Sequence, residues 1–218
     1  MTSTAVRDPG STTARPAQSR VRRLGLVEYL PTWRAMQAFT ASRRAGTLDE
    51  IWMLEHPPVY TLGVAGRHTH LPRGRNTLPV IQVDRGGQIT YHGPGQVVLY
   101  LLLDLKHLQL GVRSLVRRIE QAVIDLLGEY AIVSRGRVEA PGVYVGEAKI
   151  AALGLRVRNG CCYHGLSLNV DMDLAPFHAI DPCGYPGLAV TQLRDLGVSA
   201  SMSAVGERLV EHVSQVLR

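Results

Sequence analysis

The sequence is poor in cysteine, lysine and long apolar runs, and each shortage excludes a class of protein. Three cysteines are an odd number, and two of them, Cys161 and Cys162, are adjacent. A disulfide framework is therefore not expected, and a reducing, cytoplasmic location is predicted. The longest apolar run, residues 97–103, has seven residues, whereas a membrane-spanning helix needs roughly 18 to 20. We therefore expect no membrane partner.

Lysine is scarce, since only Lys106 and Lys149 among the 24 lysines and arginines are lysine. An arginine guanidinium stays protonated in proteins, whereas burial lowers the pKa of a lysine amine. Either lysine is therefore a candidate for proton transfer in a way that the arginines are not.

Positive charge is unevenly distributed along the chain. The net charge is +6, but residues 1–23 hold five arginines and a single acid, Asp8, which leaves a net +2 for the rest. Such a body suits acidic protein partners but lacks the clustered basic face typical of nucleic-acid binding. No nucleic-acid partner is expected.

The first 22 residues are rich in Ser, Thr, Arg, Pro and Gly. We predict a disordered tail over 1–22 and one catalytic domain over 23–218. The tail lacks the apolar segment of a secretory signal, while its arginine-rich, acid-poor composition leaves an organellar transit peptide as an alternative.

Hydrophobic periodicity predicts a single α/β domain with a mixed sheet and helices outside it. An amphipathic helix is expected over 30–44, with Leu30, Trp33, Met36 and Phe39 on its apolar face. The other expected elements are strands at 51–54, 80–83, 88–91 and 97–103, a loop from 59 to about 78, a helix over 115–130, a hairpin of strands 153–157 and 166–170 across 159–160, and a final helix over 203–217.

Three segments carry candidate chemistry. Residues 85–96 place four glycines directly before an apolar strand, so they form either a pair of tight turns or a backbone cradle for a ligand. They contain no Gly-Lys-Ser/Thr sequence, so a phosphate-binding loop is not indicated. Lys149 begins an apolar strand and is either a solvated lysine or a desolvated amine whose pKa falls toward neutrality.

The cysteines differ in their surroundings. Cys183 lies between turn-forming residues and is either inert or a nucleophile, whereas Cys161 and Cys162 adjoin strands and are interpreted as packing residues. His92, His164 and Cys183, and likewise His68 and His70, do not show zinc-type spacing, so no metal is expected.

Five segments together resemble the ordered motifs of the lipoyl(octanoyl) transferase family, over about residues 24–217. These segments are LEHPPVYTLG at 54–63, RGGQITYHGPGQ at 85–96, PGVYVGEAKI at 141–150, YHGLSLNV at 163–170 and PCG at 182–184. The resemblance implies the fold shared by lipoate–protein ligases and the catalytic domain of biotin ligases. The flanks differ from the family pattern, notably residues 147–148 and the long N-terminal tail.

The resemblance also implies an acyltransferase activity. An octanoyl group would pass from octanoyl-acyl carrier protein to a specific lysine of lipoyl domains through an acyl-cysteine thioester, the first committed step of endogenous protein lipoylation. The acceptors would be the lipoyl domains of 2-oxoacid dehydrogenase complexes and the glycine cleavage H protein. No cofactor, ATP or metal is expected, because the donor arrives as a thioester on phosphopantetheine.

Site residues follow from the same resemblance. Cys183 would be the nucleophile and Lys149 its proton-relaying partner, with His164 and Asn169 as candidate supporting residues. The expected substrate-binding residues are Arg85, Gly86, Gly87, Gln88, Ile89, Thr90, Tyr91, His92, Ala152, Leu153, Gly154, Gly165, Leu166 and Ser167.

Two other functions compete with this one. An ATP-dependent lipoate or biotin ligase would activate a free acid and need no cysteine. A non-catalytic module would only bind an acyl carrier protein through arginine-rich surface.

Overall fold

The computed structural model describes residues 19–218, apart from the side chain of Cys183. Its strands form a seven-stranded sheet, ordered β1-β2-β6-β10-β9-β8-β7, and a three-stranded sheet, ordered β4-β3-β5. The strands are β1 (Arg20–Leu26), β2 (Glu50–Glu55), β3 (Val59–Leu62), β4 (Val80–Gln82), β5 (Ile89–His92), β6 (Gln96–Asp104), β7 (Arg135–Gly136), β8 (Gly142–Val145), β9 (Ala148–Arg158) and β10 (Cys161–Asn169). The helices are α1 (Tyr29–Ser42), α2 (Val112–Glu129) and α3 (Met202–Val216), with 3-10 turns η1 (His68–His70), η2 (Ala175–Ala179), η3 (Pro182–Gly184) and η4 (Arg194–Leu196).

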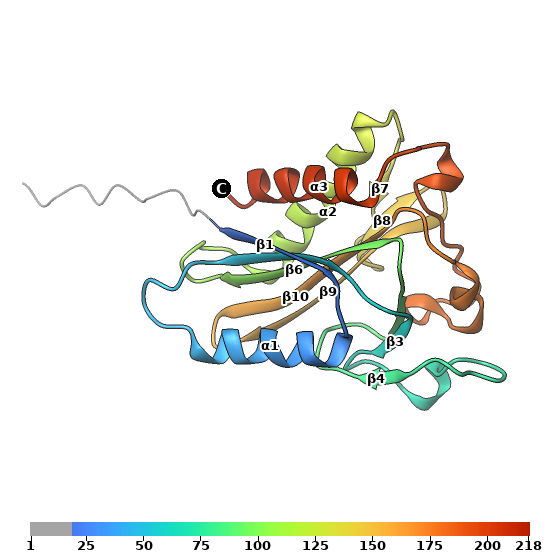
Figure 1. Cartoon of the computed structure of the whole chain (residues 1–218), viewed down its shortest axis with the longest axis horizontal. Helices are drawn as coiled ribbons and strands as arrows, with labels where there is room; N and C mark the ends of the chain where they lie inside the picture. Colours follow the sequence, from blue (N-terminus) through green and yellow to red (C-terminus); the bar gives the residue numbers. More distant parts are fainter. Residues whose placement is uncertain (1–18) are drawn as a thin grey trace, which may run out of the picture.

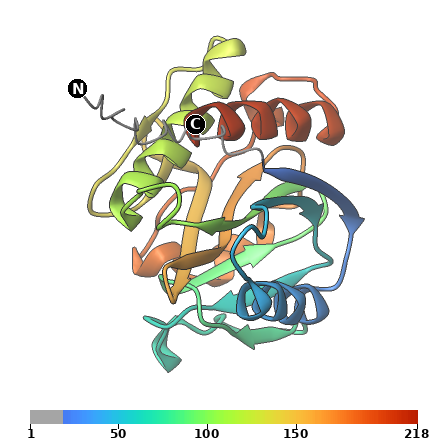
Figure 2. The ribbon, with the colours of Figure 1, turned by 90° about the vertical axis from the view of Figure 1, so that its left-hand side faces the viewer.

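The large sheet separates two layers. Helices α2 and α3 cover one face, whereas α1 and the small sheet cover the other (Figure 1, Figure 2). Within the large sheet, β1 pairs with β2 in parallel and the other neighbours are antiparallel. The prediction of a single α/β domain with a mixed sheet is confirmed.

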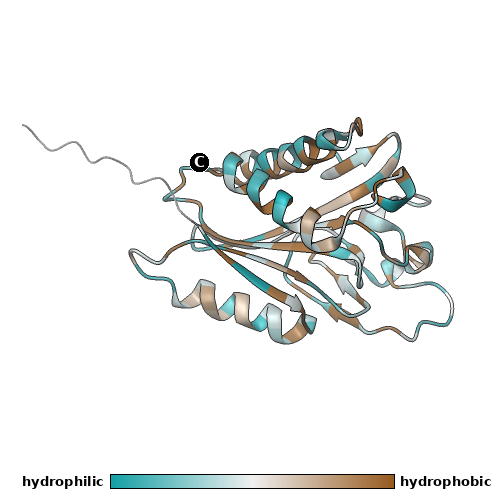
Figure 3. Cartoon of the chain, turned by 45° about the horizontal axis from the view of Figure 1, so that its top comes forward, coloured by the Kyte–Doolittle hydropathy of each residue, from teal (hydrophilic) through white to brown (hydrophobic). Residues whose placement is uncertain are grey.

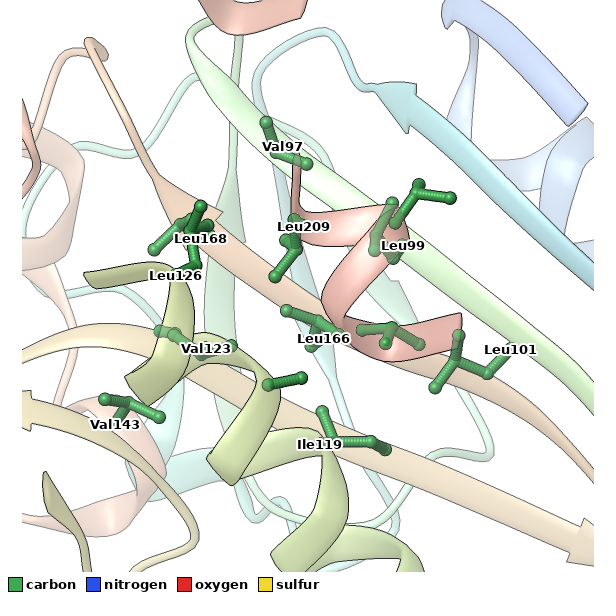
Figure 4. Packing of buried hydrophobic residues seen from close by; sticks show 14 of the residues in the cluster. Val97, Leu99, Leu101, Ile119, Val123, Leu126, Val143, Leu166, Leu168 and Leu209 are labelled. Carbon is green, nitrogen blue, oxygen red and sulfur yellow. The ribbon is translucent and has the colours of Figure 1, made fainter. Parts of the chain in front are cut away.

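Strand β6 supplies both layers, because successive side chains point to opposite faces of a strand. Its residues Val97, Leu99 and Leu101 pack under α2 and α3 with Ile119 and Leu209 (Figure 4). The brown of hydrophobic residues accordingly concentrates in the strands between the helices (Figure 3). The expected strand at 97–103, buried on both faces, is confirmed.

The hairpin predicted across residues 159–160 is also present. Asn159 and Gly160 have φ of 54° and 85°, which the common two-residue hairpin turn requires at both of its central positions. β9 and β10 then pair without a register shift from Arg158–Cys161 to Ala151–Leu168. This regular pairing places the small residues of both strands opposite one another.

Three expectations need correction. Residues 59–62, expected as the start of a loop, form β3, which is fully buried and pairs with both β4 and β5. The helix over 29–42 buries Tyr29, Thr32, Met36 and Thr40, while Leu30 is exposed, because the buried stripe advances by three or four residues rather than by three.

The start of the domain is earlier than expected. Residues 20–22 were assigned to the tail, but they begin β1, held in register by the Arg20 N–H to Asp49 carbonyl bond of 2.8 Å. The remaining tail prediction, on residues 1–18, lies outside the described residues. Within residues 19–218, no helix is long and apolar enough to cross a membrane.

Candidate active site

A pocket lies between the two sheets, and we call it the inter-sheet pocket. Its empty volume is about 500 Å³, counting the solvent at its open mouth. One wall comes from β6, β9 and β10, and the other from residues 85–92 and the start of α1. The lining residues are Tyr29, Arg85, Gly87, Gln88, Ile89, Thr90, His92, Val98, Tyr100, Ala152, Leu153, Gly154, His164, Gly165, Leu166 and Ser167.

Small residues on the floor strands make room for this pocket. Alternation along β9 and β10 turns Ala152, Gly154, Gly165 and Ser167 toward it. A Cβ at Gly165 would lie 2.0 Å from the Leu99 carbonyl oxygen, so only glycine fits there. The floor is therefore set by backbone and by very short side chains.

The glycine-rich segment forms the opposite wall by folding back over the floor. Gly87 has a φ of 83°, in the region that favours glycine. The Gly86 N–H donates to the Leu155 carbonyl at 2.9 Å, which ties the segment to β9. The buried Arg85 donates from Nη2 to the carbonyl and hydroxyl oxygens of Thr61 at 2.6 and 2.9 Å.

A chain of polar groups with fixed proton directions reaches the pocket lining. His56 Nδ1 donates to the Val27 carbonyl at 2.6 Å, so its Nε2 accepts from the Tyr100 hydroxyl at 2.7 Å. The Tyr100 oxygen in turn bonds to the Tyr29 hydroxyl. Burial lowers the pKa of His56 to about 4 and raises that of Tyr29 to about 12, so both side chains are uncharged near neutrality.

A second polar chain leads away from the pocket. His92 Nδ1 donates to Gln96 Oε1 at 2.7 Å, Gln96 Nε2 donates to Asn169 Oδ1 at 2.9 Å, and Asn169 Nδ2 donates to the Thr191 carbonyl at 2.9 Å. Burial is the main cause that lowers the pKa of His92 to about 3. Asn169 therefore fixes the amide orientation of Gln96, whose oxygen in turn holds the proton of His92 on Nδ1.

The third polar group is centred on Asp84. Burial alone would raise its pKa, but hydrogen bonds from the side chains of His164, Tyr163, Trp33 and Gln37 lower it well below the usual range. His164 Nε2 donates to Asp84 Oδ1 at 2.9 Å while the His164 backbone takes a φ of 63°. The carboxylate thus orients a histidine of the pocket wall and anchors it to α1.

A smaller pocket, which we call the lysine pocket, adjoins the first. It shares Thr90, Ala152 and Ser167 with the inter-sheet pocket and contains Lys149 and Pro182. The remaining lining residues are Gln96, Ile150, Ala151, Asn169, Phe177 and Val190. The three shared residues show that the two pockets are adjacent.

Lys149 is buried in this pocket, with only 3% of its surface exposed. Its Nζ donates to the Pro141 carbonyl at 3.2 Å and lies 5.1 Å from the centre of the Tyr144 ring. Its backbone N–H donates to the Ala189 carbonyl at 2.8 Å, and its carbonyl accepts from the Thr191 N–H at 3.0 Å. Both the strand and the amine are therefore held in place.

A β-bulge explains why this lysine faces the pocket. The β8–β9 register shifts by one residue between Val143 and Tyr144, and both Ile150 and Ala151 pack into the core under α2. A one-residue shift moves the preceding side chains to the other face of a strand. Lys149 consequently lies on the side of Ala152, which alternation alone would not predict.

The two neighbours of residue 183 in the chain adjoin different pockets. Pro182, before it, lines the lysine pocket, and a Cβ at Gly184, after it, would be 3.1 Å from Gln88 Nε2 of the inter-sheet pocket. Turn η3 is closed by the Gly184 N–H to Asp181 carbonyl bond of 2.9 Å. The side chain of Cys183 is outside the described part of the chain.

The other two cysteines are in the large sheet, away from both pockets. The Cys162 thiol is buried and donates to the Leu101 carbonyl at 3.4 Å, and burial raises its pKa to about 12. Burial also raises the pKa of Cys161. Neither environment favours a thiolate, in line with the interpretation of both as packing residues.

Most of the residues expected in the site are brought together by the fold. Of the 14 expected substrate-binding residues, Gly86 and Tyr91 do not line either pocket, since Gly86 bonds to β9 and Tyr91 packs its ring on Phe177 at 5.5 Å. His164 lines the inter-sheet pocket and Asn169 the lysine pocket. Sequence reasoning missed the pocket residues Tyr29, Val98 and Tyr100, although alternation from the pocket side of β6 could have identified the last two.

Comparison with known sequences gives consistent results. The family described as Lipoyl protein ligase A/B catalytic domain matches residues 28–214. "Octanoyltransferase" of Dechloromonas aromatica (strain RCB) is 63% identical over 197 residues, which cover 90% of this chain and 96% of the relative. "Octanoyltransferase" of Laribacter hongkongensis (strain HLHK9) is 62% identical, with 88% and 93% covered.

Solved structures show the same fold at low identity. A bipartite lipoate protein ligase from Thermoplasma acidophilum superposes with a TM-score of 0.68 and 18% identity, covering 92% of this chain and 84% of that one. Biotin protein ligase from Aquifex aeolicus, in complex with biotin and ATP, gives a TM-score of 0.58 and 15% identity, covering 91% and 70%. At these identities the likeness concerns the fold alone.

Proposed function

The chain belongs to the octanoyltransferase family and is an acyltransferase acting in lipoylation, and from this premise we propose that it moves octanoyl from acyl carrier protein to a lipoyl-domain lysine through a thioester on Cys183. Lys149 relays the protons. The acceptors proposed are lipoyl domains of 2-oxoacid dehydrogenase complexes and the glycine cleavage H protein.

The observation that supports this proposal is that the chain neighbours of residue 183 adjoin two adjacent pockets. Pro182 contributes to the pocket of the buried amine, and Gly184 adjoins Gln88 of the larger pocket. An acyl carbonyl bound beside residue 183 can therefore have its chain in the inter-sheet pocket and the Lys149 amine close to its reacting end. This is the arrangement that nucleophilic acyl transfer needs.

In the first step the Cys183 thiolate attacks the thioester carbonyl of the donor. A carbon–sulfur bond to Cys183 forms, the bond to the phosphopantetheine sulfur breaks, and Lys149, as an ammonium, protonates the leaving thiolate. A positive charge beside the thiol also favours the thiolate form of Cys183.

In the second step the acceptor lysine amine attacks the acyl-Cys183. An amide bond forms, the Cys183 sulfur leaves as a thiolate, and the neutral Lys149 amine takes the proton that the attacking nitrogen loses. Lys149 thereby returns to the ammonium form in which the first step began, so one group serves both half-reactions.

The inter-sheet pocket supplies binding energy for the chain. Burial contributes roughly 0.8 kcal/mol per methylene, so the seven carbons beyond the carbonyl supply about 5 kcal/mol. One methylene more or less changes affinity only about fourfold. Strict selection of eight carbons therefore requires a steric end to the pocket, and we propose that the buried Tyr29 and Tyr100, which line it, form this end.

The energetics of the donor account for the proposed absence of cofactors. A thioester is already activated, so the transfer needs no ATP and no metal. The donor's phosphopantetheine arm brings the acyl group to the mouth of the site. We place the reaction in the cytoplasm, where the free thiols of Cys161 and Cys162 remain reduced.

The test is an intact-protein mass spectrum after mixing with octanoyl-acyl carrier protein, without ATP. The wild type is compared with Cys183→Ser and with a matched Cys161→Ser/Cys162→Ser double variant. We expect one octanoyl adduct on the wild type and on the double variant, none on Cys183→Ser, and loss of the adduct when a lipoyl domain is added.

Two results would contradict the proposal. An adduct that persists in Cys183→Ser would move the nucleophile elsewhere. Labelling of the lipoyl domain that requires ATP and a free acid would instead favour a ligase reaction.

A further inference from the structure

Glu120 is a carboxylate on the sheet-facing side of α2, although the sequence pattern places it off the apolar stripe. Its Oε1 accepts a hydrogen bond from the Gly142 N–H at 2.9 Å. A Cβ at Gly136 would lie 3.0 Å from its Oε2. The half-buried carboxylate is thus enclosed by β7 and β8 instead of projecting into solvent.

Gly142 connects this carboxylate to the lysine pocket. A Cβ at Gly142 would lie 3.0 Å from Lys149 Cε and 3.2 Å from Lys149 Nζ, and Nζ donates to the carbonyl of the preceding residue, Pro141. The Gly142 N–H therefore contacts Glu120, while the Gly142 Cα and the Pro141 carbonyl contact the Lys149 amine. Displacement of this backbone would displace the amine.

The other charged groups around the amine are already engaged or point elsewhere. Among the described residues, Glu147 pairs with Arg135 and Arg137, each at 2.6 Å. Asp181 pairs with Arg73 at 2.8 Å, and the Arg137 guanidinium lies 4.1 Å from the centre of the Tyr144 ring.

Within α2, the positive charge of Arg117 also acts on Glu120. Burial raises the pKa of Glu120, and the Gly142 hydrogen bond, Lys149 and Arg117 oppose that rise. The carboxylate and the Lys149 amine therefore affect each other's charge, and the tests below must vary the charge and the hydrogen bond separately.

We propose that Glu120 is a positioning residue for Lys149, which holds the 141–142 backbone against the amine and supplies the negative charge that favours its ammonium form. This inference rests on the proton-relay role given to Lys149 above. It adds a helix residue, remote from the acyl chain, to the groups that control the reaction.

The proposal predicts a specific pH effect. Without a nearby negative charge the pKa of the Lys149 amine falls, so the ammonium needed for acylation is lost at a lower pH. Glu120→Gln keeps an oxygen that can accept from Gly142 N–H but removes the charge. Glu120→Asp keeps the charge on a shorter side chain.

The experiment measures the rate of octanoyl loading by rapid-quench mass spectrometry across pH 6 to 10, with octanoyl-acyl carrier protein as the donor. For Glu120→Gln we expect the alkaline limb of the profile to move down by about one pH unit, with about a tenfold lower rate above the limb. Glu120→Asp should restore the limb. Glu129→Gln, an exposed change on the same helix, should match the wild type in its pH profile.

The outcomes separate this inference from the proposed function. An alkaline limb at the wild-type pH in Glu120→Gln overturns the inference. An equal loss of loading rate at every pH also overturns it, because it would indicate a purely structural role. If thermal unfolding shows that Glu120→Gln does not fold, the pH profile of Glu120→Asp is the deciding measurement. An alkaline limb at lower pH in Glu120→Asp, which retains the charge, would contradict the proposal.

A separate variant tests the premise. Wild-type loading by Lys149→Ala would overturn the relay role itself and thus the proposed mechanism. An inactive Lys149→Ala combined with an unchanged Glu120→Gln would overturn this inference alone.

Discussion

The two faces of the seven-stranded sheet differ in chemistry although the same strands build both. Under α2 and α3, the buried side chains from β6 are aliphatic, such as Leu99 and Leu101. On the opposite face the adjacent residue is Tyr100, which lies with His56, His164 and Tyr29 around the inter-sheet pocket. Because side chains alternate along a strand, one face can provide stability while the other provides a binding site.

The difference has an energetic consequence. Close packing stabilises the aliphatic face, whose side chains need no hydrogen-bond partners. Each buried polar group on the pocket face must instead keep its hydrogen bonds. Changes to the first face should therefore alter stability and spare selectivity. Changes to the second should alter selectivity or the pH dependence of stability.

The largest effect is expected from Leu101→Ala on the aliphatic face. Leu101 is fully buried between β6 and the two helices, so the cavity and lost burial should lower the free energy of unfolding by about 2–5 kcal/mol. Urea denaturation measures the change. The preference among acyl chain lengths should remain that of the wild type, and a shifted preference would mean that the two faces are not independent.

Acid should destabilise the protein through the pocket face. Burial lowers the pKa of His56 to about 4 and of His92 to about 3, below the value of about 6.5 in the unfolded chain. Between these values the unfolded state binds protons that the folded state does not, so stability is complete above about pH 6.5 and falls toward pH 4. His56 alone accounts for a loss on the order of 3 kcal/mol by pH 4.

Unfolding free energies at pH 7, 6, 5 and 4 give the slope that tests this expectation. His56→Gln should reduce the slope of the unfolding free energy against pH, independently of its effect on stability at pH 7. His107→Gln, an exposed change after β6, serves as the control and should keep the wild-type slope. Equal slopes in all three proteins would show that His56 does not control acid stability.

A larger side chain where the two pockets adjoin should change selectivity without loss of stability. Ala152 lines both pockets, so Ala152→Leu should obstruct a long acyl chain and lower octanoyl transfer by about 10- to 100-fold, or about 1.4–2.7 kcal/mol. Transfer of butanoyl should fall much less. Competition between the two acyl donors, read by mass spectrometry, measures the ratio, and an equal loss for both would place the acyl chain outside the inter-sheet pocket.

The regular parts of both faces are predictable from sequence, and the irregular parts are not. Apolar periodicity identified α2, α3, β6 and the β9–β10 hairpin, because one residue pattern and one face determine each. Strand β3 was missed because Pro57 and Pro58 indicate an interruption and its partners are brought in by tertiary pairing. Tyr100 was missed because β6 is apolar on both faces, so that only alternation along the strand marks the side on which Tyr100 lies.

The functional residues followed the same division. Motif resemblance indicated Lys149 and the glycine-rich segment, but the direction of Lys149 depends on a β-bulge that no local pattern reveals. Glu120 is one residue away from the apolar stripe of α2, and its inward orientation depends on Gly136 and Gly142 leaving space across the sheet. Such features arise from close approaches between segments far apart in the sequence.

The smallest effect is expected at Arg73, in the exposed loop between β3 and β4. Its guanidinium contacts Asp181 at 2.8 Å and the carbonyls of His178 and Ile180 at 3.2 and 3.3 Å. These contacts hold the segment that leads into η3 and Cys183. Arg73→Gln should therefore slow octanoyl loading by about tenfold, or about 1.4 kcal/mol, while thermal stability stays nearly constant because an exposed ion pair contributes little.

Arg75→Gln is the matched control, since it removes the same charge from the same loop and is exposed. Loading in this variant should be close to wild type. An equal decrease in both variants would instead attribute the effect to the loop's positive charge, as expected if an acidic donor binds there. The pair thus decides whether this exposed loop contributes to the pocket face by positioning residue 183 or only by attracting the donor.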